Sequence, residues 1–375
     1  MSDLPRVLFV GRARHRLPLP EWLAKKWDAF DEQLDYRILG AAEAGSPLRA
    51  ERFRLSPPAR PRRLDGILFH LRLPFRVARE LREFQPQAAV ASDPFIGAAV
   101  LAGRTIARRQ VPVIVEVHGD WRTFTRLYGS SWRKLLAASA DRLAVFALRR
   151  ADATRALSRF TSSLIEDARG RPADGIFPTY SDLSAFTEDP LRELPERPTA
   201  LFVGMLEPYK NVEGLAAAWR RVVQQLPEAQ LVVVGRGSQQ DVIERLVDAL
   251  PEQVEYVPQL DPRGVARALD EATVLVLPSW PEGLGRVVIE AFARGRGVVA
   301  TDAGGIPDLV RHGVEGLLIP PADEGGLVAS LVRALGDRAL AERLGAAAHG
   351  RYADWHSTPA AFAAAYRELV ERTIG

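Results

Sequence analysis

Two carboxylates, Glu282 and Glu290, flank a predicted turn between a buried strand and a helix. The apolar run Thr273–Pro278 has the length and β-branched character of a buried strand. The run Arg286–Arg294 predicts a helix, which Gly295 stops. Glu282 therefore precedes this helix and Glu290 lies within it.

The start of this helix has the features of an anion-binding site. Gly283 and Gly285 let a ligand approach the backbone, and the first N–H groups of a helix have no partner within it. Eight residues of helix rise about 12 Å, so the two carboxylates could hold the hydroxyl-rich ends of one extended molecule with a diphosphate between them. These residue types favour a sugar nucleotide as the ligand.

The same stretch resembles the donor-site motif of family 4 retaining glycosyltransferases, whose GT-B architecture consists of two facing Rossmann-like domains. The motif, Glu-x7-Glu after Pro-Ser and before Ala-Phe-Ala-x-Gly, stands here at residues 278–295. Further matching segments are Leu201–Asn211, Leu231–Gly237 and Ala303–Pro307. The resemblance covers most of residues 198–325, and before residue 190 it is confined to Val117–Gly119, Leu157–Arg159 and a strand–helix alternation.

The resemblance implies roles for the residues around this helix. Glu290 would hydrogen-bond both hydroxyls of a ribose, and Glu282 would bind hydroxyls of the donor sugar. The backbone N–H groups that would meet the sugar or the diphosphate are those of Gly283, Leu284 and Gly285. Taken singly, Glu282 also fits a carboxylate that stabilises a helix N-terminus, and Glu290 a solvated helix residue.

A cation follows the predicted strand Ala200–Val203. By resemblance, Lys210 binds the phosphates, at a characteristic spacing from Gly204. The family commonly carries an arginine directly after that glycine, where this chain has Met205, and a thioether cannot neutralise a phosphate. Arg286, beside the helix start, is our candidate for the missing second cation.

Two further glycine turns are candidates. Gly304 and Gly305 stand between a strand and a helix start, either beside the donor sugar or diphosphate or as an ordinary turn. Gly11 ends the first predicted strand, where the family often has a glycine-rich loop near the diphosphate. The arginines within residues 12–16 follow instead, and they either bind an anionic acceptor or face solvent.

His118 is the candidate from the first half of the chain. It follows the predicted strand Val113–Val117, at the end of a strand where ligands bind in open α/β sheets. In the resembling family a histidine here contacts the donor sugar, whereas the alternative is a core histidine satisfied by the following turn. Asp120 and Trp121 follow in the same loop and could touch the donor or the acceptor.

The chain alternates strand and helix signals, which predicts parallel sheets with right-handed crossovers. A length of 375 residues suits two domains. We expect an α/β protein of the GT-B type with a central cleft. Its acceptor domain would span residues 1–190 together with a final helix within 355–375, and its donor domain would span 195–352. The Pro- and acid-rich stretch Thr187–Pro198 is the predicted linker.

The individual elements follow from periodicity and from glycine and proline positions. Strands are predicted at residues 6–11, 88–92, 113–117, 153–158, 200–203, 231–234, 254–257, 273–277, 297–301 and 316–319. Helices are predicted at residues 20–30, 67–84, 95–109, 131–150, 159–169, 212–225, 239–250, 264–271, 286–294, 306–310 and 358–373.

The first half of the chain is basic. Residues 1–190 hold 31 Lys and Arg against 22 Asp and Glu, whereas the remainder holds 19 against 25. This asymmetry suggests an anionic acceptor or an anionic membrane surface, or else solvated arginines without a partner. Within the amphipathic run Leu68–Phe84 we favour a buried helix face over membrane contact. The residues of that predicted buried face are Phe75, Ala78, Leu81 and Phe84.

The composition excludes several classes of protein. The absence of cysteine excludes disulfides and thiolate catalysis. No Asp-x-Asp occurs, so we expect neither a metal nor a cofactor besides the donor substrate. The N-terminus offers no signal-peptide core and no apolar run approaches a membrane span, which predicts a cytoplasmic protein, with peripheral contact at the inner membrane face as an option. We expect no nucleic-acid partner.

The sequence thus predicts a metal-independent, retaining hexosyltransferase that moves a sugar from a nucleoside-diphosphate sugar to a glycan or a lipid-linked glycan. A sugar-nucleotide epimerase of the same fold and a non-catalytic carbohydrate-binding relative are the alternatives. A nicotinamide-dependent oxidoreductase is disfavoured, because Gly235-Arg-Gly237 lacks the third glycine of the dinucleotide fingerprint.

Overall fold

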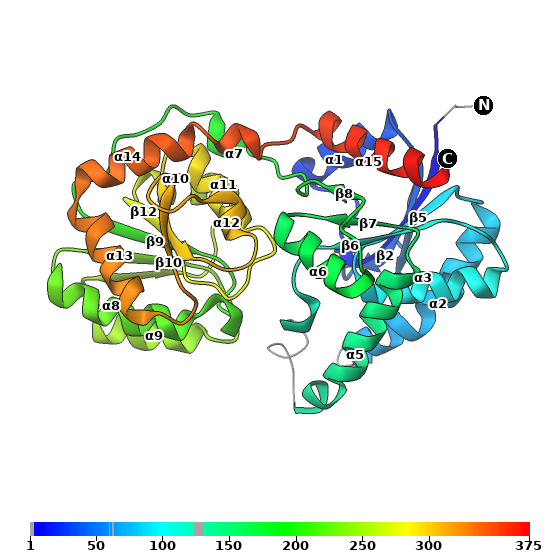
Figure 1. The fold of residues 1–375 in the computed structure, drawn as a ribbon, viewed down its shortest axis with the longest axis horizontal. Helices are drawn as coiled ribbons and strands as arrows, with labels where there is room; N and C mark the ends of the chain where they lie inside the picture. The colour runs from blue at the N-terminus through cyan, green and yellow to red at the C-terminus, as the bar shows by residue number, and fades with distance from the viewer. Residues whose placement is uncertain (1–3, 60, 62–63, 124–130) are drawn as a thin grey trace. The chain divides into compact units, whose positions relative to one another are not determined.

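The chain folds into two compact units (Figure 1). The computed structural model describes residues 4–59, 61, 64–123 and 131–375. One unit consists of Met1–Tyr180 with Ser357–Gly375, and the other of Ser181–His356. The boundary lies between Tyr180 and Ser181, earlier than the predicted domain end at residue 190.

The first unit contains an eight-stranded sheet in the order β3-β4-β2-β1-β5-β6-β7-β8. Neighbouring strands are parallel except β3 and β4. The strands are β1 Arg6–His15, β2 Asp35–Ala42, β3 Arg49–Ala50, β4 Phe53–Ser56, β5 Ala88–Ala91, β6 Val113–Val117, β7 Ala153–Ala156 and β8 Gly175–Ile176. β2, β3, β4 and β8 have no predicted counterpart, because β3 and β8 are two residues long and charged residues interrupt the apolar pattern of β2 and β4.

The first strand is longer than predicted. β1 continues past Gly11 to His15, with an irregularity in its pairing between Val10 and Arg14. It continues because β2 runs on beside it, and His15 pairs with Ala42. The prediction that Gly11 ends the strand is therefore wrong.

Helices cover both faces of this sheet. They are α1 Glu21–Asp31, α2 Asp65–Glu83, α3 Pro94–Ala107, α5 Ser131–Arg150, α6 Arg159–Arg169 and α15 Pro359–Ile374. Apolar residues of α2, α3, α5 and α6 share one core with the sheet, and those of α1 and α15 share the core on the opposite face. The final helix, red in Figure 1, lies beside the blue α1, so the end of the chain returns to the first unit as the GT-B resemblance implies.

The second unit contains a six-stranded, all-parallel sheet in the order β11-β10-β9-β12-β13-β14. Its strands are β9 Thr199–Val203, β10 Gln230–Val234, β11 Val254–Val257, β12 Val274–Leu277, β13 Gly297–Thr301 and β14 Gly316–Ile319. Its helices are α7 Ser184–Thr187, α8 Val212–Gln225, α9 Gln240–Ala249, α10 Pro262–Asp270, α11 Arg286–Ala293, α12 Ile306–Leu309, α13 Glu324–Gly336 and α14 Arg338–His349.

Helices α13 and α14 have no predicted counterpart. Asp323 caps α13 by accepting from the Gly326 N–H, and Asp337 caps α14 by accepting from the Leu340 N–H. An aspartate before an apolar-periodic run is a helix-start signal, so both helices could have been found from the sequence.

The predicted linker is fastened to the second unit. Residues 186–195, here called the strap, carry backbone carbonyls that accept hydrogen bonds from three arginines. The donors and acceptors are Arg294 to Phe186, Asp189 and Pro190, Arg296 to Arg192 and Glu193, and Arg338 to Leu194 and Pro195. A stretch rich in proline and acidic residues predicts a free linker, but here hydrogen bonds from distant arginines satisfy its backbone carbonyls.

One predicted buried face is wrong in part. Ala78, Leu81 and Phe84 are buried, but Phe75 is 67% exposed. Helix α2 packs into the core along Phe69, Leu73 and Val77, and Phe75 lies about 200° around the helix from Leu73. Within the described part of the chain, no helix combines the length and apolarity that crossing a bilayer requires.

Candidate active site

The loops that follow β9, β12 and β13 meet at the carboxyl ends of the parallel strands, the edge at which ligands bind in open α/β sheets. Backbone hydrogen bonds join these loops. The Trp280 N–H donates to the Tyr209 carbonyl at 2.6 Å, and the Gly305 N–H donates to the Glu282 carbonyl at 2.8 Å. The predicted residues Lys210, Glu282 and Gly305 are therefore brought together.

Lys210 and Glu282 form an ion pair. Their side chains are only 10% and 13% exposed, so solvent screens their attraction less than that of a surface pair. Lys210 ends the short turn Pro208–Lys210, and its ammonium lies close to Gly204, where a Cβ atom would stand 3.7 Å from Nζ. Each charge neutralises the other, so an anion that binds Lys210 must compete with Glu282.

The N-terminus of α11 follows Glu282 directly in the sequence. Gly285 precedes the helix with φ +85°, a left-handed conformation that favours glycine. No side-chain cap satisfies the start of α11. Its first N–H groups, with the positive end of the helix dipole, can therefore serve an anionic ligand.

Glu290 lies one turn into α11 and pairs with Arg286, whose Nε is 3.1 Å from Oε1. Burial raises the pKa of Glu290, and the charge of Arg286 opposes that rise in part. Arg286 is 67% exposed, so a ligand in solution can reach its guanidinium. The predicted 12 Å helical separation of the two glutamates is wrong, because only Arg286–Glu290 is helical, a rise of about 6 Å.

The turn at Gly304 and Gly305 packs on the backbone of the glutamate loop. Glu282 and Gly304 form a β-bridge, and a Cβ at Gly304 would lie 2.2 Å from the Glu282 carbonyl oxygen. A Cβ at Gly305 would lie 2.3 Å from the Gly283 carbonyl oxygen. Close loop packing by itself therefore requires both glycines, whether or not they also touch a ligand.

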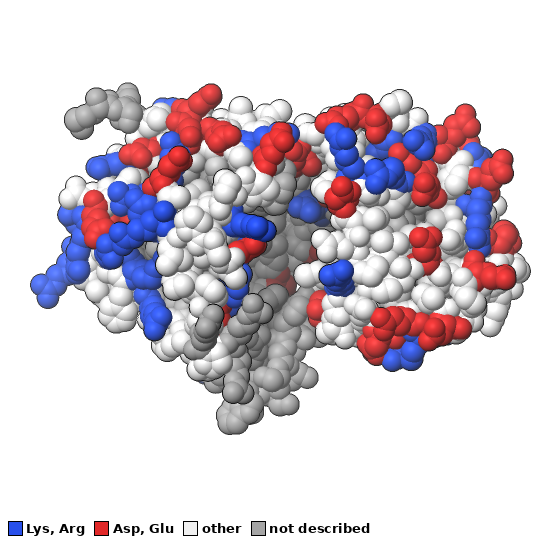
Figure 2. Space-filling view, turned by 180° about the vertical axis from the view of Figure 1, so that it is seen from behind, with Lys and Arg blue, Asp and Glu red and all other residues white. Residues whose placement is uncertain are grey.

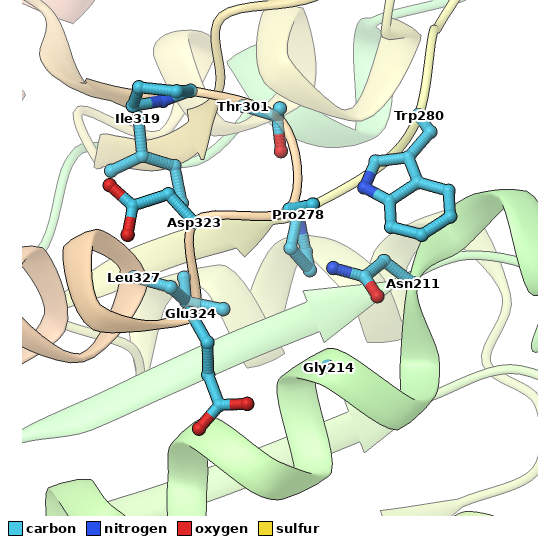
Figure 3. Close-up of a pocket in the computed structure, with 11 residues that line it drawn as sticks. Asn211, Gly214, Pro278, Trp280, Thr301, Ile319, Asp323, Glu324 and Leu327 are labelled. Atoms are coloured by element: carbon cyan, nitrogen blue, oxygen red, sulfur yellow. The ribbon is translucent and has the colours of Figure 1, made fainter.

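A pocket of about 190 Å³ lies beside these loops (Figure 3). Its lining residues include Thr301 at the end of β13, and Asn211, Trp280 and Asp323 on the loops that follow β9, β12 and β14. Lys210, Glu282 and Glu290 do not line it. The pocket is therefore a neighbour of the predicted site and not the site itself.

In the first unit, His118 belongs to a buried network. Its Nε2 lies 3.3 Å from Oε2 of Glu116, which also pairs with the buried Arg155 at 2.5 Å and accepts from the hydroxyl of Tyr366 on α15. Burial alone would raise the pKa of Glu116, but Arg155 and its other partners hold that pKa well below its usual range. The His118 side chain is 43% exposed, so its ring is held from one side and open on the other.

Sequence reasoning missed Glu116, Arg155 and Tyr366. The available signal was a charged residue inside each of two predicted buried strands, Val113–Val117 and Ala153–Ser158, since buried charges are rare unless paired.

Most of the other candidate residues of the first unit pair or pack with neighbouring residues of that unit. Arg14 donates to Asp65 at 2.6 Å, with Arg12 at 4.0 Å from the same carboxylate. Asp120 accepts from the Arg122 N–H and the Thr123 hydroxyl. Packing accounts for two more residues. Trp121 is buried in the core, and a Cβ at Gly11 would lie 3.2 Å from the Ser92 hydroxyl.

Two family models match the chain. The model for glycosyl transferases group 1 matches residues 197–337, and the model for the glycosyl transferase 4-like domain matches residues 20–178. Together these matches take in most of both units. The chain belongs to the group 1 glycosyltransferases and has their GT-B fold.

Individual relatives agree with this assignment. A sulfoquinovosyl transferase of Arabidopsis thaliana is 29% identical over 73% of this chain and 54% of its own length. A phosphatidyl-myo-inositol mannosyltransferase of Mycolicibacterium smegmatis is 32% identical over 44% of this chain and 43% of its own. The chain thus spans about half the length of these relatives.

The fold itself is similar to that of HepE from Anabaena, whose structure was solved in complex with UDP-glucose. The two structures align with a TM-score of 0.71 and 17% identity over 98% of this chain and 99% of the other.

Proposed function

We propose that this protein is a retaining hexosyltransferase that moves a sugar from a nucleoside-diphosphate sugar to an acceptor, a glycan or a lipid-linked glycan. One observation supports the proposal most strongly. The loop that carries Glu282, which pairs with Lys210, leads directly into the uncapped start of α11, and α11 holds the buried Glu290. An ammonium, backbone N–H groups at a helix start and two carboxylates are what a charged diphosphate between two hydroxyl-rich groups requires.

Each residue then has a role. Glu290 accepts hydrogen bonds from the ribose hydroxyls, and Glu282 accepts them from the donor sugar. Lys210, with the backbone N–H groups of Gly283, Leu284 and Gly285, stabilises the negative charge that grows on the leaving diphosphate. This positive charge supports a reaction without a metal, and Arg286 supplies a second cation in place of the arginine that Met205 replaces.

The chemical step follows from the resemblance to retaining enzymes of this family. The bond between the anomeric carbon and the diphosphate oxygen breaks, and the acceptor oxygen bonds to that carbon on the same face. The proton of the acceptor hydroxyl passes to the leaving phosphate. His118, with Glu116 behind it, contributes a hydrogen bond to the donor sugar.

The comparisons support this choice of substrates. The name of one relative gives phosphatidyl-myo-inositol as its acceptor and a mannosyl group as the sugar it moves, and a structure of the same fold holds UDP-glucose. These facts concern those proteins, and they make a lipid-bearing acceptor and a nucleotide sugar the first substrates to test here.

A thermal-shift panel tests the proposal. The full chain is heated with UDP, GDP, ADP, their common sugar conjugates and NAD. A ligand present at about 100 times its Kd adds about 2.7 kcal/mol of stability, which raises Tm by several degrees in a domain of this size. We expect one nucleoside diphosphate and its sugar conjugate to raise Tm, and a shift with NAD alone or with no nucleotide would overturn the proposal.

A further inference from the structure

Helix α2 presents a stripe of large apolar side chains to solvent. Ile67, Leu71 and Phe75 are 59%, 64% and 67% exposed. Their four-residue spacing places them in one line along the helix. Leu64, just before the helix, is 41% exposed and lies one turn ahead of Ile67.

The packing of the first unit does not account for this stripe. The opposite face of α2 already fills the core with Phe69, Leu73, Val77 and Leu81. Single exposed apolar residues are ordinary on protein surfaces, but a contiguous apolar patch marks an interaction site. The stripe is therefore a surface with a function outside the core.

The surroundings of the stripe are basic. Arg72 and Arg79 are exposed on α2 beside it, and Arg82 donates to the Ile106 carbonyl at the end of α3. The only carboxylate paired with these three arginines among the described residues is Glu83, 2.7 Å from Arg79. Figure 2 shows Lys and Arg gathered, with few Asp and Glu, over the edge of the first unit that carries α2.

The same helical layer repeats this composition on α5, which packs against α3 as α3 packs against α2. Leu143 and Phe146 are 46% and 49% exposed. Exposed arginines accompany them at positions 142, 149 and 150. Apolar side chains flanked by arginines thus recur across the outer side of the α2–α3–α5 layer.

We propose that this outer side, centred on the stripe Ile67–Leu71–Phe75, docks on an anionic lipid bilayer. An apolar helix face bordered by cations binds at the boundary between headgroups and acyl chains, with the apolar side chains inserted and the cations on anionic headgroups. A second copy of the chain is disfavoured as the partner, because a self-complementary contact would place arginines against arginines. The proposal goes beyond sugar transfer and does not rest on it.

Vesicle co-sedimentation tests the proposal. The full chain is mixed with vesicles of phosphatidylcholine alone or of phosphatidylcholine with phosphatidylglycerol, at low and at physiological salt. We expect binding to the phosphatidylglycerol vesicles only, weakening as salt rises. Leu71→Asp combined with Phe75→Asp is expected to lower the binding constant at least about tenfold, and Arg72→Glu at least about fivefold.

Val314→Asp, at an exposed apolar residue of the second unit, is the matched control and should bind vesicles as the wild type does. All variants should keep the Tm of the wild type and its nucleotide-induced shift, so a failure of this inference is separable from a failure of the proposed function. Absence of vesicle binding at low salt would overturn the inference, as would equal binding by the double variant. Self-association of the wild type that the double variant loses would instead identify a second copy as the partner.

Discussion

At the scale of single residues, the ion pair between Lys210 and Glu282 lies where the proposed function places the donor. Both side chains are nearly buried and each is the other's partner. A diphosphate that reaches Lys210 must therefore share the ammonium with Glu282 or displace it. In the proposed site, the transferred sugar of the donor offers hydroxyl groups to Glu282 in exchange, and a nucleoside diphosphate lacks that transferred sugar.

This competition predicts an unusual pair of effects for Glu282→Gln. The substitution keeps the shape of the side chain but removes its charge, so Lys210 is left for the phosphates. We expect the nucleoside diphosphate to bind more tightly, on the order of fivefold or about 1 kcal/mol, while transfer from the sugar nucleotide slows. Calorimetric titration and a transfer assay measure the two effects, and weaker diphosphate binding would contradict the competition.

Glu290 predicts a pH dependence. Its pKa is raised by burial above the ordinary value of 4.5, so the folded protein holds this proton at pH values where the unfolded chain has lost it. Stability therefore falls as pH rises through the window between 4.5 and the raised pKa. In the proposed site donor binding needs the carboxylate, so affinity should fall as pH is lowered through the same raised pKa.

Titrations of the nucleoside diphosphate across this window measure the effect. The variant Glu290→Gln shows the pH dependence that belongs to the nucleotide's own phosphates. Identical pH profiles for the wild type and the variant would rule Glu290 out as the titrating group.

At the scale of elements, the strap is held by arginines that the sequence presents as ordinary. Arg294 is 1% exposed, pairs with Asp270 at 2.7 Å and donates to three strap carbonyls. Its removal leaves the buried Asp270 carboxylate and the strap without their main partner. We expect Arg294→Met to lower the free energy of unfolding by about 3–5 kcal/mol and to make residues 186–195 sensitive to proteases.

Arg263→Met is the matched control, because Arg263 reaches Glu188, at the strap, through a pair whose side chains are 72% and 53% exposed. Such a surface pair contributes about 0–1 kcal/mol. Chemical denaturation and limited proteolysis compare the two variants. Equal losses in both would mean that Arg294 does not fasten the strap.

The elements show what the sequence can and cannot predict. Periodicity identified α8, α11 and every strand of the second sheet, because buried parallel strands are continuous apolar runs. The same pattern wrongly placed Phe75 in the core, and composition wrongly predicted a free linker at the strap. Both errors concern facts set by distant residues: which side of α2 meets the sheet, and which arginines reach the strap carbonyls. Glu282, Glu290 and Lys210 were found by motif, whereas their pairing required the fold.

At the scale of the whole molecule, the chain enters the first unit twice. Tyr366 of the returning helix α15 is buried, and its hydroxyl donates to Glu116 and accepts from Arg155 at 2.9 Å. Its ring packs against Phe9 and Phe30. The end of the chain is thus joined to the network that holds His118.

Tyr366→Phe isolates this connection, because it deletes one hydroxyl and keeps the ring. The buried Glu116 then loses a donor, which we expect to cost about 1–3 kcal/mol. Differential scanning calorimetry of the full chain is the measurement. The stabilisation of the second unit by the nucleotide sugar should persist. An unchanged Tm would show that the hydroxyl does not tie α15 to the sheet.

The proposed donor site lies on the second unit, and one titration tests that site most directly. The nucleotide sugar selected by the thermal-shift panel is titrated calorimetrically into the wild type, into Glu290→Gln, and into Glu342→Gln, which alters an exposed Arg–Glu pair of the same i, i+4 spacing on α14. We predict binding to the wild type and to Glu342→Gln. The neutral amide of glutamine offers one acceptor oxygen in place of two and removes the charge assistance from both hydrogen bonds to ribose, so we predict about a hundredfold loss in Glu290→Gln. Equal affinity of all three proteins, or no binding by the wild type, would contradict the assignment of this site.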